Sequence, residues 1–352
     1  MTLTTVNAGM LDTQAQYNGF KNRIINGQMV LDQRNAGAAV TPATNTYLVD
    51  RWQAVPSDAS KLTYQQVADA PAGFKFSLKV TVASSATPAS YNILWQPIEG
   101  FNVIDLGFGA AGAQTIAVGF WIKGSVAGNY SAFLGNNAGR SYLVSVPVTT
   151  SWAYQTVSIT GDTSGTWPTT NAAGMYLGFD MGSDASRYST AGSWLASNVY
   201  GVTGNLKFIS QVNGSTLNIT GVQLEKGSTA TSFDYRPYGT ELQLAQRYYY
   251  LHASGSGKCV GIGGYVQAAE VACGVYFPVT MRSTPTLSAA SGTGYYTAAR
   301  AAADVFDSFT AYQISTTCSF LYNTAEASGT SGASAYVYTS NASASVAFTA
   351  EL

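Results

Sequence analysis

Side chains suited to acid–base or metal chemistry are scarce in this chain. They include a single histidine, His252, and two carboxylate pairs, Asp180 with Asp184 and Asp304 with Asp307. Glycoside hydrolysis needs two carboxylates at a defined separation in a cleft, and sequence spacing does not establish that separation. Asp180 and Asp184 stand among Gly and Ser residues and could offer the oxygen ligands that Ca²⁺ prefers. We favour a solvated surface loop there, with a calcium site as the alternative and catalysis last.

The low histidine content argues against an enzyme, because most acid–base and metal chemistry near neutral pH uses histidine. We expect His252 to be a hydrogen-bonded structural group. Three cysteines, Cys259, Cys273 and Cys318, form no CxxC pair, and their odd number argues against a disulfide framework. The sequence therefore predicts a protein without enzyme activity, without a cofactor and without a catalytic metal.

Two glycine-rich stretches match parts of nucleotide-binding motifs. Residues 107–112 read GxGxxG, but dinucleotide binding requires a following helix, and an alternating strand-like run at 116–122 follows instead. Residues 255–258 (GSGK) resemble a P-loop, yet Cys259 stands where Ser or Thr is required. We interpret both stretches as loops.

Composition excludes several classes of protein. Only 10% of the 352 residues are charged, against about 25% in an ordinary soluble domain, while 46% are hydrophobic and 12% aromatic. This content is too apolar for a disordered chain, and a net charge of −1 gives no field that would attract nucleic acid. No apolar run approaches the roughly 18 residues of a membrane span. Residues 1–20 lack the basic and apolar regions of a secretory signal. We predict neither a nucleic-acid partner nor membrane insertion.

Short alternating runs of apolar and polar residues dominate the chain and predict an all-β fold. The clearest lie at 74–82, 116–122, 157–159, 206–208, 217–219, 271–277 and 346–348. The apolar phase slips at Gly221, which indicates a β-bulge. Helix signals are confined to 241–247, with Thr240 as N-cap, and to the alanine-rich stretch 298–303.

Residue types divide unevenly along the chain, which indicates two domains. All six tryptophans precede residue 195, whereas the cysteines and the histidine follow residue 250. We place the boundary near 236–239. Tyrosine, with 23 copies, combines a flat apolar face with a hydroxyl, which suits sugar contacts, although aromatic residues also favour strands as such.

Three stretches together resemble a family of tailed-phage virion proteins, usually labelled tail fibre or minor structural proteins. The stretches are 22–35 with 47–52, then 219–238 with 246–249, and 277–286. The region between the first two is similar to jelly-roll carbohydrate-binding modules, with 121–124 and 152–165 at the expected strand and turn positions. The resemblance spans about residues 20–290 and the ending 349–352. One departure is Ala245, where relatives often have cysteine.

This resemblance implies a virion protein with a jelly-roll β-sandwich and a smaller C-terminal β domain. We expect residues 1–22 to attach the chain to tail or capsid proteins, 23–238 to form the sandwich, 239–250 to be a short helix and linker, and 251–352 to form the second domain. The implied function is a tail fibre or tail-associated adhesin that contacts a host-surface glycan. A capsid decoration protein or head fibre is the alternative, and a polysaccharide depolymerase is the least favoured.

The composition also predicts that copies of this chain associate. A β-rich chain with few charges must cover its strand edges and apolar patches, and a homo-oligomer, expected to be a trimer, would do so. Several copies would also strengthen weak sugar contacts.

Several individual residues have expected roles. We expect Tyr295, Tyr296 and Tyr312 to be surface aromatics that contact the ligand. The remaining assignments are structural and concern Asp50, Arg51 and Trp52, as a buried pair and an indole that hold the first strand, and Arg236 and Pro237 at the boundary.

Overall fold

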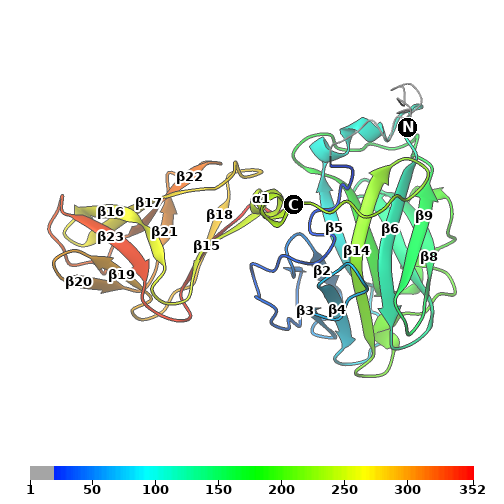
Figure 1. Ribbon diagram of the computed structural model, residues 1–352, viewed down its shortest axis with the longest axis horizontal. Coiled ribbons are helices and arrows are strands. Elements are labelled where there is room, and N and C mark those ends of the chain that lie inside the picture. The colour runs from blue at the N-terminus through cyan, green and yellow to red at the C-terminus, as the bar shows by residue number, and fades with distance from the viewer. Residues whose placement is uncertain (1–19) are drawn as a thin grey trace, which may run out of the picture. The chain divides into compact units, whose positions relative to one another are not determined.

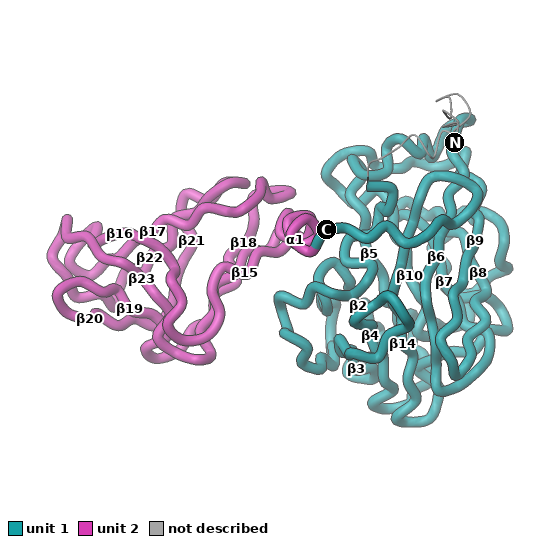
Figure 2. Tube along the Cα trace, in the orientation of Figure 1, with its two compact units in different colours: residues 1–237 teal, residues 238–352 magenta. Residues whose placement is uncertain are grey.

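The computed structural model describes residues 20–352, whose regular secondary structure is almost entirely β-strand (Figure 1). The chain divides into two compact units, unit 1 ending at Pro237 and unit 2 comprising Tyr238–Leu352 (Figure 2). In the described part, the one α-helix is α1 (Tyr238–Gln246), and no helix has the length and apolar character to cross a bilayer. The predicted all-β fold is therefore confirmed.

Unit 1 is a jelly-roll sandwich of two antiparallel sheets. The seven-stranded sheet has the order β1 (Thr46–Tyr47), β2 (Gln53–Pro56), β5 (Tyr91–Glu99), β10 (Ala173–Ser183), β7 (Gly128–Asn136), β8 (Arg140–Val148), β12 (Trp194–Leu195). The five-stranded sheet has the order β3 (Leu62–Val67), β4 (Ser77–Val82), β14 (Thr216–Lys226), β6 (Ile116–Gly124), β9 (Ala153–Ile159). Short elements complete it: β11 (Tyr188–Ser189) parallel to β13 (Gly201–Val202), and the 3-10 turns η2 (Gly100–Asn102), η3 (Ile104–Leu106), η4 (Ala185–Arg187) and η5 (Phe208–Ser210).

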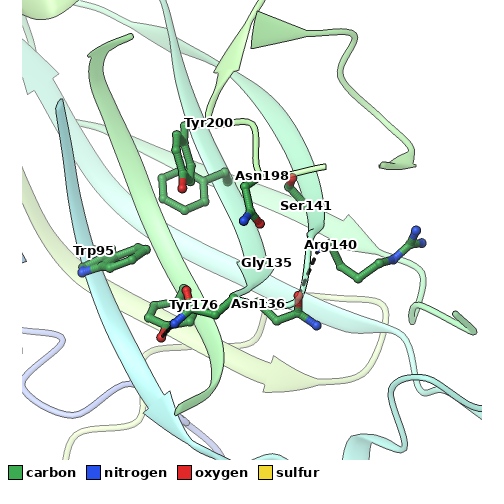
Figure 3. Close-up of a pocket in the computed structure, with 10 residues that line it drawn as sticks. Trp95, Gly135, Asn136, Arg140, Ser141, Tyr176, Asn198 and Tyr200 are labelled. Carbon is green, nitrogen blue, oxygen red and sulfur yellow. Dashed lines mark hydrogen bonds between the residues drawn. The ribbon is translucent and has the colours of Figure 1, made fainter. Parts of the chain in front are cut away.

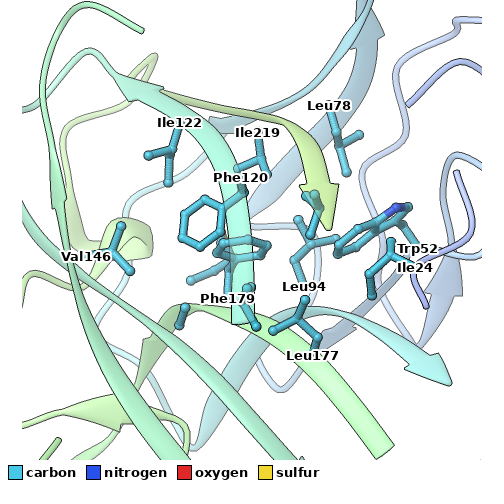
Figure 4. Close-up of a cluster of buried hydrophobic side chains, with 14 of the residues drawn as sticks. Ile24, Trp52, Leu78, Leu94, Phe120, Ile122, Val146, Leu177, Phe179 and Ile219 are labelled. Carbon is cyan, nitrogen blue, oxygen red and sulfur yellow. The ribbon is translucent and has the colours of Figure 1, made fainter. Parts of the chain in front are cut away.

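The core of unit 1 lies between the two sheets, as the alternating pattern requires. Phe120 from β6 meets Phe179 from β10 edge to face, with ring centroids 5.1 Å apart (Figure 4). Trp52 is fully buried and lies 6.3 Å from the Phe179 ring. Because alternate residues of β6 point inward, the intervening residue Trp121 is placed on the outer face.

The predicted bulge at Gly221 is confirmed. The ladder between β14 and β6 shifts register between Thr220 and Gln223, and Gly221 has a φ of 62°. A Cβ on this residue would lie 2.7 Å from the Phe74 ring and 3.0 Å from the Trp121 ring. Glycine is therefore required both by the left-handed backbone and by the two rings.

Replacing this glycine should destabilise unit 1. We expect Gly221→Ala to lower the free energy of unfolding by about 1–2 kcal/mol, since alanine is strained at positive φ. Chemical denaturation followed by tryptophan fluorescence measures the change. Gly112→Ala is the matched control, because nothing lies within 4 Å of a Cβ at Gly112 and its φ is not positive. Equal midpoints for the two variants would contradict the prediction.

The start and the end of unit 1 are bound to each other. The backbone N–H of Asn22 donates to the Asp234 carboxylate (3.2 Å), and the Asn22 side chain donates to the carbonyl of Val222 (3.1 Å). The buried Arg236 guanidinium donates to the carbonyls of Asn22 and Ile24. Asn22, the last residue of the predicted attachment segment 1–22, is thus packed into unit 1. Residues 1–19 of that segment lie outside the described residues. Arg236 links the two ends of the unit.

The buried residues Asp50 and Arg51 contact different partners. The Asp50 carboxylate lies 3.6 Å from the guanidinium of Arg34 and accepts a hydrogen bond from Gln33 (2.9 Å). Arg51 reaches β5, where it donates to the carbonyl of Pro97 (2.6 Å). The two side chains therefore hold the segment before β2 through separate contacts.

Unit 2 has a three-stranded and a seven-stranded antiparallel sheet around a second core. The small sheet has the order β15 (Tyr249–Ser254), β24 (Ser345–Thr349), β18 (Thr286–Ala289). The large sheet has the order β20 (Ala303–Phe306), β19 (Tyr296–Ala299), β23 (Ser334–Thr339), β16 (Cys259–Gln267), β17 (Glu270–Tyr276), β22 (Cys318–Asn323), β21 (Thr310–Tyr312). Val271, Leu321 and Val337 point from the large sheet into that core.

Three local predictions differ from the structure in unit 2. The stretch 298–303 is not helical but turns from β19 to β20, because Ala298 is fully buried in the sheet and tertiary packing overrides alanine's helix propensity. The helix predicted at 241–247 is present and ends one residue earlier, at Gln246, but it begins at Tyr238, so Thr240 lies inside it and is not its N-cap. Tyr249 and Tyr250, predicted as linker, belong to β15 and pair with β24.

Candidate functional site

The predicted ligand-contacting tyrosines do not form one surface. Tyr296 is fully buried on β19, where its ring stacks on Phe306 with centroids 5.7 Å apart. Its hydroxyl donates to the carbonyl of Ser345 (2.9 Å). The prediction of Tyr296 as a surface aromatic is wrong, because the alternation of β19 turns its ring inward. Tyr295 is half-buried, and Tyr312 is 57% exposed on β21.

All four paired carboxylates accept hydrogen bonds from the protein; Asp304 accepts from the Tyr265 hydroxyl (2.9 Å) and Asp307 from the Gly294 N–H (2.7 Å). Asp180 is buried and accepts hydrogen bonds from the Ser183 hydroxyl (2.7 Å) and the Gly182 N–H (3.1 Å), and burial raises its pKa to about 6. Asp184 is half-buried and accepts from Ser186 N–H (2.8 Å), and the Ser186 hydrogen bonds lower its pKa. Within residues 20–352, no group of three or more His, Cys, Asp or Glu side chains is placed to hold a metal. We interpret these carboxylates as structural hydrogen-bond acceptors.

His252 is a structural imidazole in unit 2. Its Nε2 lies 2.7 Å from the carbonyl of Val260, and its Nδ1 lies 2.8 Å from the Tyr250 hydroxyl. A carbonyl accepts only, so Nε2 carries the proton and Nδ1 accepts from Tyr250. Burial lowers the pKa of His252, which keeps the ring neutral. The arrangement matches the expected hydrogen-bonded structural role.

One aromatic surface lies on the outer face of the seven-stranded sheet, around Trp95 (Figure 3). Trp95 stacks on Tyr176 with centroids 4.3 Å apart, and its indole N–H donates to Gln53 (2.8 Å). The Tyr176 hydroxyl accepts from the Asn137 amide (2.5 Å), and burial raises its pKa to about 12. The rings are thereby fixed in orientation.

Little room remains at this surface. The hollow beside Trp95 has a volume of about 10 Å³, which is about the space of one water molecule. The Arg140 side chain extends away from it and makes a two-pronged ion pair with Asp162 (2.6 and 2.8 Å). These groups satisfy one another, so we interpret the Trp95 surface mainly as packing.

A larger groove lies on the outer face of the five-stranded sheet. It has a volume of about 390 Å³, within the range of roughly 300–1,000 Å³ typical of ligand pockets. We call it the Trp121 groove; its lining is Ala72, Phe74, Trp121, Tyr154, Gly221, Ala230, Thr231, Ser232, Phe233 and Tyr235. Five of these ten residues are aromatic.

The rings of the Trp121 groove form two groups. Trp121 on β6 and Tyr154 on β9 are cross-strand partners with centroids 5.4 Å apart. Phe74, Phe233 and Tyr235 form the second group, with centroids 5.0 to 5.6 Å apart. Gly221 lies between the groups, and its missing side chain leaves the space open.

Polar atoms at the Trp121 groove are hydroxyls. Tyr154 and Tyr235 are 40% and 55% exposed, and the Tyr235 hydroxyl donates to the Gly73 carbonyl (3.2 Å). Ser232 adds another hydroxyl group, whereas the Thr231 hydroxyl donates to the Glu225 carboxylate (2.7 Å). None of the ten lining residues is charged. The groove therefore suits an uncharged ligand that combines apolar faces with hydrogen-bonding groups.

Sequence reasoning did not single out this groove, although it held a usable signal. Trp121 occupies the outward phase of a strand whose inward residues are Ile116, Val118, Phe120 and Ile122. An indole at an outward position is unusual, since large apolar side chains normally fill the core phase. The contributions of Phe74 and Phe233 come from loops and depend on the tertiary fold.

Comparisons with known proteins give fold-level likeness only. No protein-family model matches the chain, and no curated protein is similar to it. Among solved structures, the enzymatically active domain of bacteriophage CBA120 tailspike protein 4 is 13% identical over 58% of this chain, with a TM-score of 0.32. This chain covers 21% of the tailspike chain.

Two smaller solved structures are covered nearly in full. A putative sugar-binding protein from Bacteroides thetaiotaomicron is 13% identical over 59% of this chain and 100% of its own, with a TM-score of 0.33. The N-terminal cellulose-binding domain of β-1,4-glucanase C from Cellulomonas fimi is 15% identical over 51% of this chain and 90% of its own, with a TM-score of 0.30. Likeness at this level carries no argument about a ligand, which must come from the groove itself.

Proposed function

We propose that unit 1 binds a neutral glycan in the Trp121 groove. The observation that carries this proposal is an uncharged groove of about 390 Å³ whose walls are aromatic rings and whose polar atoms are hydroxyls. A pyranose ring has an apolar C–H face that packs on an aromatic ring and a rim of hydroxyls that exchange hydrogen bonds. An anionic sugar would find no cation among the lining residues.

Removing the central indole tests the proposal. We expect Trp121→Ala to weaken binding of the full chain to a neutral polysaccharide by roughly 10- to 100-fold, the loss of about 1.5–3 kcal/mol of stacking and burial. A panel of soluble β-glucan, xylan and galactan, measured by isothermal titration calorimetry and affinity electrophoresis, identifies the polysaccharide bound.

Two variants sharpen the result. Tyr154→Phe keeps the ring and removes the hydroxyl, so a smaller loss is expected. Trp152→Ala is the matched control, because this half-buried indole lies outside the groove and its N–H faces Asp69 (3.3 Å). No binding by the wild type to any neutral polysaccharide, or equal losses for Trp121→Ala and Trp152→Ala, would sink the proposal.

We further propose that the chain is a non-enzymatic virion protein, a tail fibre or tail-associated adhesin whose groove contacts a host-surface glycan. Support comes from the sequence resemblance of 22–35, 219–238 and 277–286 to tailed-phage virion proteins. In this proposal residues 1–22 dock on other virion proteins and the chain forms a homotrimer. We expect tens of copies per virion, counted by quantitative mass spectrometry. Immuno-electron microscopy should locate them at the tail. Hundreds of copies on the capsid would assign a decoration protein instead, and release of reducing ends from polysaccharide would assign a depolymerase.

A further inference from the structure

One face of the large sheet of unit 2 is exposed and apolar. Along this face, cross-strand pairs place Tyr336 beside Ile262, and Phe320 beside both Gly274 and Tyr312. The pairing of Gly263 with Cys273 brings Ile262 next to Gly274, so the five residues form one row across five strands. We call this row, together with Tyr276 two residues beyond Gly274 on β17, the Tyr336 face.

The side chains of the Tyr336 face are highly exposed for their type. Ile262 and Tyr276 are each 80% exposed, Tyr336 is 58%, Tyr312 is 57% and Phe320 is 44% exposed. At about 150–250 Å² for each aromatic side chain, the four rings alone expose roughly 500 Å². The largest patch on a typical monomer is about 300–600 Å² and is often functional. The Tyr336 face thus has the size of a patch that often serves in binding.

Charge is absent from the Tyr336 face and from the outward positions next to it. Continuing the row, Tyr336 pairs with Ala299 on β19, which pairs with Ala303 on β20. Two residues further along the strands, the same face carries Thr297, Tyr338, Ala272 and Tyr322. No Asp, Glu, Lys or Arg occurs at any of these described positions. A partner chosen by charge has nothing to recognise here.

We propose that the Tyr336 face packs against the same face in other copies of this chain, as the contact surface of the homotrimer proposed above. An uncharged surface meets its own copy without like-charge repulsion, and the whole chain carries a net charge of only −1. With Ile262 and the flanking residues, the area approaches the about 800 Å² per partner of a standard interface. Tyrosine and phenylalanine are enriched at the centres of such interfaces.

The shape of the face also suits self-association. Small residues stand beside large ones at two points of the row, where Tyr336 lies next to Ala299 and Phe320 lies next to Gly274. Tyr338 stacks on Tyr336 with centroids 5.9 Å apart and supports it from one side. Rings from one copy can therefore fill the hollows over alanine and glycine of the other. A glycan is the poorer occupant, because tyrosine hydroxyls are almost the only polar groups that this row offers.

The test is the mass of the full chain by sedimentation velocity and light scattering over a range of concentrations. We expect the wild type to associate, and Ile262→Asp to raise the dissociation constant by roughly 30-fold or more, since it buries an unpaired carboxylate at the interface. Val212→Asp is the matched control, because Val212 is 75% exposed in unit 1 and lies off the face. A wild type that stays monomeric, or Ile262→Asp that associates like the wild type, overturns the proposal.

Two further variants make the outcome specific. Tyr336→Ser removes a ring without adding charge and should weaken association by a smaller factor, which guards against misfolding of Ile262→Asp. Trp121→Ala should leave association unchanged, so this proposal and glycan binding in unit 1 fail separately. A monomeric chain that still binds neutral polysaccharide after Trp121→Ala and loses it after Ile262→Asp would assign the face to a sugar and overturn self-association.

Discussion

Trp52→Ala should lower the free energy of unfolding of unit 1 by about 3–5 kcal/mol, the cost of removing a fully buried large side chain. Trp52 has no exposed surface, and its ring lies beside the Phe179 ring in the core. Its indole N–H donates to the carbonyl of Asn26 (3.2 Å). The variant therefore creates a cavity and leaves a buried carbonyl without its donor.

Tryptophan fluorescence measures the unfolding of unit 1 within the full-length chain. All six tryptophans lie in unit 1, so urea unfolding of the full chain followed at tryptophan reports that unit alone, and Trp52→Ala keeps five of them. Trp152→Ala, which removes a half-buried indole, should cost less than about 1 kcal/mol. If both variants shift the midpoint equally, Trp52 does not have the structural role assigned to it.

Asp180→Asn should make unit 1 more stable above about pH 6 and leave it unchanged below about pH 4. Burial raises the pKa of Asp180 from 3.8 to about 6, so the folded state holds a proton that the unfolded state releases. Stability of the wild type therefore falls as pH rises through this window, by about 3 kcal/mol for a shift of about two pKa units. Asparagine removes the charge and keeps an oxygen for Ser183 and Gly182.

Unfolding at a series of pH values measures the slope. The carboxylate also faces the Tyr188 hydroxyl and lies near Lys207, but neither offsets the burial. Asp184→Asn is the control, because the pKa of Asp184 is lowered rather than raised, so this change should give no gain in stability at high pH. Burial raises the pKa of Asp50 to about 6 as well, so some of the wild-type slope should persist in Asp180→Asn. An unchanged slope in Asp180→Asn would contradict the assignment.

Sequence alone was sufficient where one local rule decided the outcome. Alternation located β6 and β17, and the slip of phase at Gly221 located a bulge that the backbone requires. It failed at 298–303, where helix propensity competed with burial in a sheet and burial won. Tyr296 was misplaced for a related reason, because a four-residue strand is too short to show which phase is inward.

The candidate groove lay beyond sequence reasoning because its walls come together only in the folded chain. Trp121 and Tyr154 are neighbours across a strand pair, and alternation could have marked both as outward. Phe74 and Phe233 are 159 positions apart and meet with centroids 5.1 Å apart through loop conformation. No periodic pattern encodes such a contact.

The link between Asn22 and Arg236 has an evolutionary consequence. The described start and the end of unit 1 lie next to each other. The whole sandwich can therefore be inserted into a surface loop of another protein without moving the ends of that loop apart. Adjoining ends of this kind are the geometry that tolerates insertion of a domain into another protein. Recombination that moves the sandwich as one piece would therefore leave its fold intact.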